Sequence, residues 1–287
     1  MWPIPDSPAL VQRVREAYYA ACTALDAAPI PDTNEVWGWQ GRTLSKTVTT
    51  VQGRAWLRLA STETSQLINT FWNGTIDAQR RLPSTIPRPQ LRRWHDWADS
   101  QHSYRGELYD YITTNTISTH AVATTPTDLP TSWWNATRKV LDEIAAVPTT
   151  RLTVQPAFLT WAMPHYLGTP ADQHGNSSWT TAHGDFHLAN LCAPDLTILD
   201  WEGWGLAPSG YDAATLHSYS LLTPQTAHQI NTELAHQLHT PAGQYAELAV
   251  ITELLHAANQ GINPALAPSL RSRATKILDR NPAPTGR

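Results

Sequence analysis

Two neighbouring stretches dominate the sequence: Thr181-Ala182-His183-Gly184-Asp185-Phe186-His187-Leu188-Ala189-Asn190-Leu191 and Leu196-Thr197-Ile198-Leu199-Asp200-Trp201-Glu202. Ionisable residues here are interleaved with an apolar run that is typical of a buried hairpin. If the chain turns back once, the carboxylate of Asp185, the carboxamide of Asn190 and the carboxylate of Asp200 come together. We therefore expect these three side chains to form one site.

This set of side chains suits phosphoryl transfer. One carboxylate orients the attacking hydroxyl and accepts its proton, while a carboxamide and a second carboxylate hold Mg²⁺ against the phosphates. Mg²⁺ prefers hard oxygen ligands, so Asn and Asp are the expected residue types. The spacing agrees, because kinase catalytic loops place their Asn five residues after their Asp, as Asp185 and Asn190 do.

The same residues resemble a known family. The stretch from His183 to Asn190 is similar to the His-Gly-Asp-x-His-x-x-Asn loop of the aminoglycoside phosphotransferase and choline kinase family. Ile198-Leu199-Asp200-Trp201-Glu202 resembles the strand that carries the family's metal-binding carboxylate, and Gly205, Pro208 and Asp212 continue the pattern.

The resemblance implies a bilobal, protein-kinase-like α+β fold. Residues 1–108 would be a β-rich N-lobe with an N-terminal helix, and residues 109–287 a larger, mostly helical C-lobe. ATP or GTP would be the phosphoryl donor and Mg²⁺ the cofactor. Asp185 would be the base and Asn190 and Asp200 the metal ligands. The supporting residues would be His183, His187, Glu202 and Asp212.

The resemblance also places the nucleotide. Arg58 stands where the family has a phosphate-binding Lys on the third strand, and Lys46 is the alternative if the strand register differs. Asp77 and Glu63 are the candidates for the acidic residue that orients this cation in the family. The nucleotide-binding residues would be Arg58, Gly41, Arg42 and Thr43 on the phosphates, with Leu108 and Tyr109 at the hinge beside the purine.

The remaining sequence predicts strands first and helices later. Ser7-Pro8 is a favourable helix start, and apolar residues then recur at helical spacing up to Pro29. Residues 35–61 are rich in β-formers around a Gln52-Gly53 turn. We also expect a short helix near 76–81, a strand at 104–111, a loop over 164–179, helices at about 224–239 and 243–259, and a frayed tail at 280–287.

Composition limits the class of protein. The formal net charge of −4 argues against binding nucleic acid through a broad basic surface. The sequence has no stretch of 18 apolar residues and no signal peptide at its start, so we expect neither a membrane span nor secretion. Cys22 and Cys192 are then expected to be free thiols in a cytoplasmic protein.

Less specific interpretations remain for the same residues. His183 and His187 stand four apart, as zinc ligands on a helix do, but Gly184 disfavours a helix and no nearby Glu or Cys completes such a site. Arg58 is about as well explained as an exposed strand residue.

Three functions fit the sequence. The first is a phosphotransferase acting on a hydroxyl of an antibiotic, sugar or amino alcohol, in antibiotic resistance or natural-product biosynthesis, with Glu202, Glu247 and Glu253 as candidate acceptor contacts. The second is a kinase for Ser or Thr of a peptide, working with a lyase partner. The third is a non-catalytic pseudokinase, favoured by Arg58 and a sparse Gly-rich loop and opposed by the intact catalytic residues.

Overall fold

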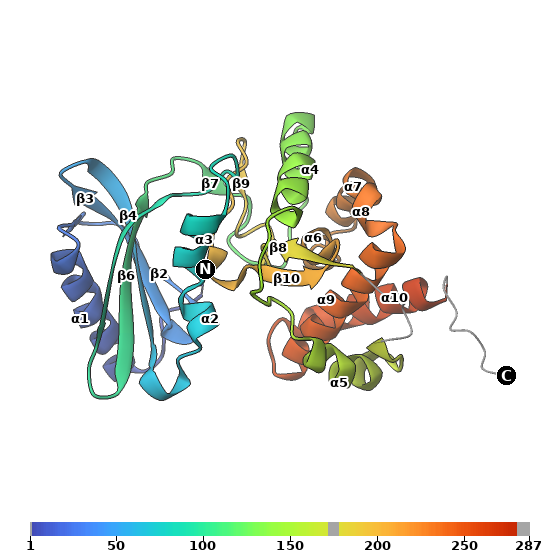
Figure 1. The fold of residues 1–287 in the computed structure, drawn as a ribbon, viewed down its shortest axis with the longest axis horizontal. Helices are drawn as coiled ribbons and strands as arrows, with labels where there is room; N and C mark the ends of the chain where they lie inside the picture. The colour runs from blue at the N-terminus through green and yellow to red at the C-terminus, as the bar shows by residue number, and fades with distance from the viewer. Residues whose placement is uncertain (1, 172–177, 280–287) are drawn as a thin grey trace. The chain divides into compact units, whose positions relative to one another are not determined.

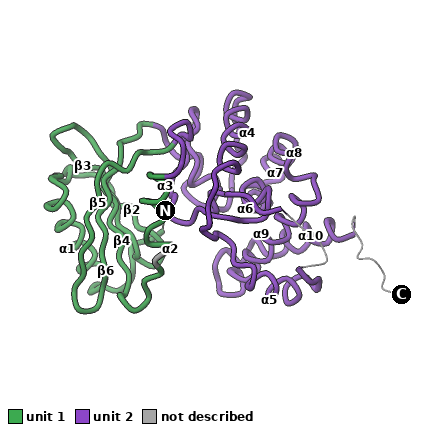
Figure 2. Tube along the Cα trace, in the orientation of Figure 1, with its two compact units in different colours: residues 1–80, 88–113 green, residues 81–87, 114–287 purple. Residues whose placement is uncertain are grey.

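The computed structural model describes residues 2–171 and 178–279. The chain divides into two compact units (Figure 2), the first made of residues up to Arg80 together with Arg88–Thr113, and the second of Arg81–Pro87 together with the chain from Thr114 onward. The predicted boundary, between residues 108 and 109, lies a few residues before this division. The predicted tail at 280–287 lies outside the described residues.

The first unit is built on an antiparallel sheet. Its strands are β1 (Ala28–Pro29), β2 (Val36–Trp37), β3 (Thr43–Thr50), β4 (Gly53–Glu63), β5 (Leu91–Ala98) and β6 (His102–Asp110). The order is β1-β3-β4-β6-β5, and β2 pairs with β3. Strands β3 and β4 form the hairpin expected around Gln52-Gly53, with Thr50 opposite Gly53.

Helix α1 (Pro8–Ala24) covers one face of this sheet (Figure 1). Ser7 caps it as the sequence predicts, since its hydroxyl accepts a hydrogen bond from the Leu10 N–H. Alternate residues of β4, including Leu57 and Leu59, are buried in the core beneath α1. Gly106 lets the helix approach closely, because a Cβ at this position would lie 2.7 Å from the Cβ of Ala21.

The opposite face of the sheet meets α2 (Asn69–Trp72) and α3 (Gly74–Arg81). Helix α3 corresponds to the short helix expected near 76–81. Strand β5 was not expected: it forms an edge of the sheet, and its middle residues are exposed, so its sequence lacks the alternation that marks a half-buried strand.

The second unit is mostly helical. Its helices are α4 (Thr131–Ala145), α5 (Pro156–Leu167), α6 (Tyr211–Tyr219), α7 (Pro224–Glu233), α8 (Ala235–Leu238), α9 (Pro241–Asn259) and α10 (Ala267–Leu278). Helix α9 is buried along much of its length, and α5, α6 and α10 pack against it (Figure 1). Two short sheets join it, β8 (Trp179–Ala182) with β10 (Gly205–Pro208), and β7 (Asn115–Thr116) with β9 (Cys192–Ala193).

Two predicted elements need correction here. The single helix expected at 224–239 is two helices, α7 and α8, because the chain leaves helical geometry at Leu234. The loop expected at 164–179 has wrong bounds at both ends, because α5 contains Pro164 and ends at Leu167, with Gly168 as its left-handed cap, and Trp179 belongs to β8; residues 172–177 lie outside the described residues. Within the described residues, no helix is both long and apolar enough to span a membrane.

Candidate active site

The loop that starts at His183 is anchored through its backbone. Strand β8 ends at Ala182, which pairs with Gly205 of β10. The carboxylate of Asp212, in the first turn of α6, accepts hydrogen bonds from the backbone N–H groups of His183 (2.7 Å) and Gly184 (3.0 Å). These two bonds tie the loop to α6, which is the arrangement expected of a scaffold residue.

The glycine in this loop is required by geometry. Gly184 has a φ of +92°, and a Cβ there would lie 2.6 Å from the Cγ2 of Thr153. Only glycine adopts this conformation without strain. The turn at Gly184 therefore sets the direction in which the chain enters Asp185.

Asp185 is held by two neighbours from its own loop. The side-chain nitrogen Nδ2 of Asn190 donates to the Asp185 carboxylate oxygen Oδ2 (2.9 Å) and to the Asp185 backbone oxygen (2.9 Å). Nε2 of His187 lies 3.2 Å from the other carboxylate oxygen, and the Asp185 side chain is 49 % exposed. The carboxylate is therefore fixed in position and accessible, as a base must be.

Asp185 and His187 each stabilise the charged form of the other. Burial acts to raise the pKa of Asp185, but the nearby His187 and its hydrogen bond outweigh it, so the pKa lies below its ordinary value. Burial acts to lower the pKa of His187, but the Asp185 carboxylate outweighs it and raises the pKa. Asp185 is consequently ionised at neutral pH and can accept a hydrogen bond from a hydroxyl.

A hairpin brings Asp200 to the same loop, as the sequence predicts. Leu191 forms an antiparallel bridge with Ile198, and the Leu199 N–H donates to the backbone oxygen of Asn190 (2.8 Å). Asp200 follows directly, with a φ of +62°, and its carboxylate also acts to raise the pKa of His187. Asp185 thus contacts His187 directly, and the charge of Asp200 acts on the same ring.

His183 joins the loop to this hairpin. Its Nδ1 accepts a hydrogen bond from the Asp185 N–H (3.2 Å), so its Nε2 carries the proton and donates to the Leu199 oxygen (2.8 Å). The ring is fully buried and meets Trp201 edge to face at 4.6 Å. Burial lowers the pKa of His183 to about 4, so the ring stays neutral and acts as a brace.

The donor set fits a magnesium ion. Because Asn190 uses its nitrogen to donate to Asp185, its carboxamide oxygen is the atom oriented as a ligand. Asp200 adds an exposed carboxylate. Mg²⁺ is commonly bound by one or two protein oxygen ligands together with substrate phosphates and water. Within 2–171 and 178–279 no group of three or more His, Cys, Asp or Glu residues is arranged to hold a metal ion.

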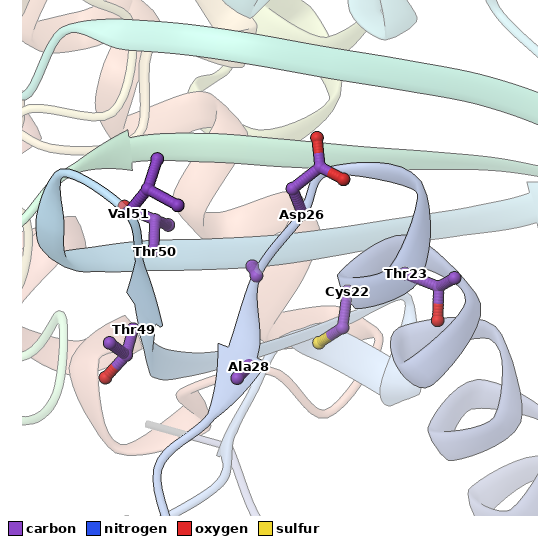
Figure 3. Close-up of a pocket in the computed structure, with 8 residues that line it drawn as sticks. Cys22, Thr23, Asp26, Ala28, Thr49, Thr50 and Val51 are labelled. Atoms are coloured by element: carbon purple, nitrogen blue, oxygen red, sulfur yellow. The ribbon is translucent and has the colours of Figure 1, made fainter.

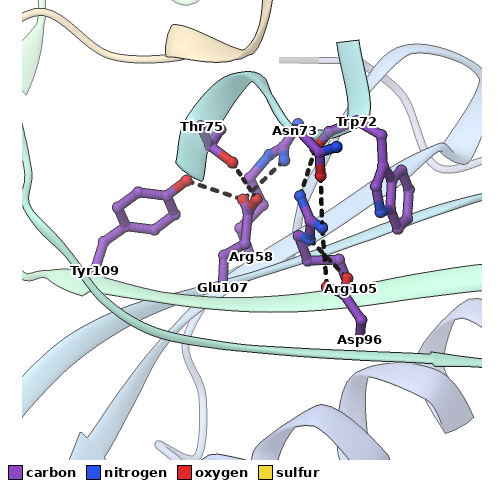
Figure 4. A network of polar contacts seen from close by, with 8 residues as sticks. All are labelled: Arg58, Trp72, Asn73, Thr75, Asp96, Arg105, Glu107 and Tyr109. Carbon is purple, nitrogen blue, oxygen red and sulfur yellow. Dashed lines mark hydrogen bonds and ion pairs between the residues drawn. The ribbon is translucent and has the colours of Figure 1, made fainter. Parts of the chain in front are cut away.

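Arg58 lies in the first unit, on the sheet face that α1 does not cover. It pairs directly with Glu107 across β4 and β6, and its Nη1 lies 3.0 Å from the Glu107 Oε2 (Figure 4). Lys46 pairs with Leu57, whose side chain is in the core under α1, so Lys46 and Arg58 are on opposite faces. The phosphate contact expected of Arg58, with Lys46 as the alternative, remains a prediction.

The Gly41-Arg42-Thr43 segment is a tight connection between β2 and β3. Gln40 and Gly41 both have positive φ values, of 52° and 73°. A Cβ at Gly41 would lie 2.6 Å from Cγ of Pro5, so the loop is packed against the start of the chain. The Arg42 guanidinium lies 5.8 Å from the centre of the Phe71 ring. The phosphate contact expected of this segment remains a prediction.

Leu108 and Tyr109 are adjacent residues of a central strand. Leu108 pairs with Leu57 and Tyr109 with Trp56, while β5 pairs with them on the other side. The Leu108 side chain is buried in the core under α1. The Tyr109 ring lies on the other face, where its hydroxyl donates to Glu107 (2.9 Å). Their expected contact with the purine remains a prediction.

An open hollow also lies in the first unit (Figure 3). Its lining comes from the end of α1 and from β1 and the β3–β4 turn, and includes Cys22, Asp26 and Val51. None of the predicted site residues is part of this lining. Asp26 would repel a phosphate, and burial raises the pKa of the Cys22 thiol to about 11, so the thiol is not a reactive nucleophile.

Comparison with solved structures identifies the fold. Aminoglycoside phosphotransferase APH(4)-Ia matches with a TM-score of 0.61 and 12% identity, over 96% of this chain and 99% of the other. The chain has the aminoglycoside phosphotransferase fold. The expected protein-kinase-like α+β architecture is thereby confirmed.

Other proteins of this fold are also similar to the chain. A microcompartment-associated aminopropanol kinase matches with a TM-score of 0.55 and 12% identity, over 90% of this chain and 94% of the other. Spectinomycin phosphotransferase APH(9)-Ia, solved with ADP and spectinomycin, matches with a TM-score of 0.52 and 12% identity, over 94% of each chain. No protein-family model and no curated protein sequence matches the chain.

In this fold, the three candidate acceptor carboxylates differ in environment. Glu247 is fully buried and bonded to His217 (2.6 Å) and Arg273 (2.7 Å), so its charge is already balanced inside the helices. Glu202 lies in the short helix after Asp200, where its backbone oxygen accepts a bond from Arg151. Glu247 is thus a structural residue, contrary to the expectation that it meets the acceptor.

Glu253 lies on α9 and is partly buried. It accepts a hydrogen bond from the Tyr211 hydroxyl. Burial raises the pKa of Tyr219, and the Asp185 and Glu253 carboxylates add to this effect, so both lie within electrostatic reach of Tyr219. The Tyr219 ring also meets His187 edge to face at 5.2 Å. The contact of Glu253 with an acceptor remains a prediction.

Replacement of Glu253 by glutamine is expected to change how stability depends on pH. Burial raises the pKa of Glu253 to about 7, and the Tyr211 bond only partly offsets this. The unfolded chain loses this proton near pH 4.5, so the wild-type free energy of unfolding falls as pH rises from about 4.5 to 7. Glu253→Gln removes that loss, worth at most about 3 kcal/mol.

Urea denaturation at pH 5 and pH 8 measures this effect. Glu253→Gln should gain stability relative to wild type at pH 8 and much less at pH 5. The control is Glu143→Gln, at a partly exposed position of α4, which should follow the wild-type pH profile. Parallel profiles for Glu253→Gln and wild type would contradict the raised pKa.

Proposed function

We propose that the protein is a phosphotransferase that moves the γ-phosphoryl group of Mg-ATP or Mg-GTP to a hydroxyl of a small molecule. The observation that carries this proposal is the geometry of the second unit. There Asn190 and His187 fix an accessible, ionised Asp185, and a hairpin brings Asp200 to the same loop. The fold it shares with known small-molecule kinases supports the same conclusion.

Each residue has a task in this mechanism. Asp185 accepts a hydrogen bond from the acceptor hydroxyl, aligns its oxygen for in-line attack, and takes its proton. Asn190 holds Asp185 by its nitrogen, and its oxygen together with the Asp200 carboxylate would hold the metal ion. Arg58 contacts the phosphates of the donor. When bound, Mg²⁺ neutralises charge on the β- and γ-phosphates.

The acceptor is proposed to be a small molecule with a hydroxyl beside a basic group. Support comes from two proteins that share this fold. APH(4)-Ia was solved with AMP-PNP and hygromycin B, and the aminopropanol kinase is named for an amino alcohol. A peptide acceptor with a lyase partner would appear instead as transfer to Ser or Thr in an acceptor screen.

A thermal-shift experiment tests the nucleotide site first. Wild-type protein with ATP or GTP should melt at a higher temperature when Mg²⁺ is present, because a ligand at 100 times its Kd adds about 2.7 kcal/mol. Asp200→Ala should lose the Mg²⁺-dependent part of this increase, because it removes a metal ligand.

Asp195→Ala is the matched control for this substitution. Asp195 is an exposed acid in the turn of the same hairpin and is not expected to touch the metal. The control should keep the full Mg²⁺-dependent shift. A chain with no shift for either nucleotide would argue for a pseudokinase, and an unchanged shift in Asp200→Ala would remove Asp200 from the metal site.

A further inference from the structure

The sheet face that carries Arg58 is lined by charged residues. Arg58, Arg105, Glu107 and Tyr109 project from β4 and β6 towards α2 and α3 (Figure 4). Glu107 is 1% exposed and Arg105 is 3% exposed. Buried charges are costly unless they are paired, so the partners of each group indicate what the face is built to hold.

Glu107 is satisfied by three different donors. Nη1 of Arg58 lies 3.0 Å from Oε2, the Tyr109 hydroxyl donates to the same oxygen at 2.9 Å, and the Thr75 hydroxyl donates to Oε1 at 2.5 Å. Burial, together with the Glu107 carboxylate, raises the pKa of Tyr109 well above its ordinary value, so the phenol keeps its proton and donates. Two neutral donors therefore hold Glu107 in place independently of Arg58.

Arg105 is held in a different way. Its guanidinium donates to Asp96 (2.7 Å), to the Trp72 backbone oxygen (2.5 Å) and to the Asn73 side chain (3.2 Å). These contacts fasten the segment between α2 and α3 to the sheet. The Arg105 side chain is 3% exposed and the Arg58 side chain is 13% exposed, so Arg58 is the more accessible of the two. The carboxylate that Arg58 contacts, that of Glu107, is also held by two further donors.

We propose that Glu107 is a positioning residue that sets the orientation of Arg58 for the phosphates of the nucleotide. This inference rests on the proposed function. Glu107, on the neighbouring strand β6, was not among the acidic residues expected to orient Arg58, and the roles expected of Asp77 and Glu63 stay predictions. Because the five N–H donors of Arg58 lie in one plane, a carboxylate that holds one nitrogen restricts the directions that the others can take. Thr75, at the start of α3, links that helix to the same carboxylate.

The alternative role for Glu107 is competition with phosphate for Arg58, and it predicts the opposite change in nucleotide affinity. A carboxylate that merely competed with phosphate for Arg58 would weaken nucleotide binding, and its removal would strengthen it. The Tyr109 and Thr75 bonds favour positioning, because they hold Glu107 at a fixed place beside Arg58 instead of letting it follow the guanidinium.

The test measures the affinity of the full chain for Mg-ATP and for adenosine by titration calorimetry. The variants are Glu107→Gln, Arg58→Ala, Arg58→Lys and the double variant. Arg58→Ala should weaken ATP binding about 10- to 100-fold, the usual effect of losing a charged bond to phosphate. Glu107→Gln should weaken ATP binding about 5- to 20-fold, with adenosine affinity changed less than about 2-fold in both.

Two further comparisons separate positioning from a structural effect. Adding Glu107→Gln to Arg58→Ala should cost little more than Arg58→Ala alone, since both act through one guanidinium. Asp96→Asn, which weakens the Arg105 pair on the same sheet, should lower the melting temperature without changing the ratio of ATP to adenosine affinity. Arg58→Lys should keep part of the ATP preference in the presence of Glu107 and lose it in Glu107→Gln.

The outcomes distinguish the inference from the proposed function. Unchanged or tighter ATP binding in Glu107→Gln, when Arg58→Ala binds weakly, would overturn the positioning role alone. Unchanged binding in Arg58→Ala would overturn the inference and leave the proposed function to the Asp200→Ala experiment. Failure of wild type to bind ATP or GTP would overturn both. An equal loss for ATP and adenosine in Glu107→Gln would show a structural role and also overturn the inference.

Discussion

Asp185→Asn is expected to lower kcat for phosphoryl transfer by about 10²- to 10⁴-fold, the range typical of a lost general base. The substitution keeps the shape of the side chain and an oxygen that can accept from Asn190, so the loop should stay in place. It removes the charge that aligns the hydroxyl and accepts its proton. Nucleotide affinity should change by less than about 2-fold, because the proposed nucleotide contacts lie at Arg58, Asn190 and Asp200.

Steady-state kinetics with an acceptor found by screening, together with calorimetry for ATP, measures both parts of this expectation. The control is Asp128→Asn, an exposed acid in the loop before α4, which should have wild-type kcat. A kcat for Asp185→Asn within a few-fold of wild type would remove Asp185 as the base. A parallel loss of ATP affinity would instead make Asp185 part of the nucleotide site.

The catalytic loop could be predicted from sequence because its geometry is local. The five-residue offset from Asp185 to Asn190 lets the side chains meet within one turn of loop. The apolar run around Leu191 and Ile198 fixes the hairpin that carries Asp200. Both features depend on residues close in sequence, where spacing alone nearly determines the contact.

Glu107 could not be predicted in the same way. It lies 49 residues after Arg58, and only the register of β4 with β6 places the two opposite each other. A one-residue change in that register would move Glu107 to the α1 face. Sequence alone pointed to acidic residues nearer to Arg58, Glu63 and Asp77, whose role stays a prediction. Strand β5 could not be predicted from the sequence for a related reason, because its exposed residues carry no alternating pattern.

Glu247 shows the limit of reading function from charge. The carboxylates of Glu247 and Glu253 lie on the same helix, and both looked like candidate acceptor contacts. The structure gives Glu247 two basic partners from α6 and α10, whereas Glu253 meets a phenol and lies within reach of Tyr219. Partners that come from distant elements decide between the two roles, and one sequence does not display them.

Arg273→Ala is expected to destabilise the protein by about 3 to 5 kcal/mol, because it leaves a buried carboxylate without its main cation. Glu247 is fully buried and accepts two bonds of 2.7 Å from Nε and Nη2 of Arg273, in a bidentate arrangement. His217 would remain its partner at 2.6 Å. Burial acts to raise the pKa of Glu247, and the bonds to His217 and Arg273 keep it below its ordinary value. Arg273→Ala therefore removes the cation from a Glu247 carboxylate that is ionised.

Chemical denaturation at pH 7 measures the change, with Arg271→Ala as the matched control. Arg271 is on the same helix, α10, and is exposed, so its replacement should alter stability by less than about 0.5 kcal/mol. Adding Glu247→Gln to Arg273→Ala should recover part of the loss, because the uncompensated charge is then gone. If Arg273→Ala were as mild as Arg271→Ala, the carboxylate of Glu247 would have to reach solvent or carry a proton, and it would return to the candidates for binding a basic acceptor.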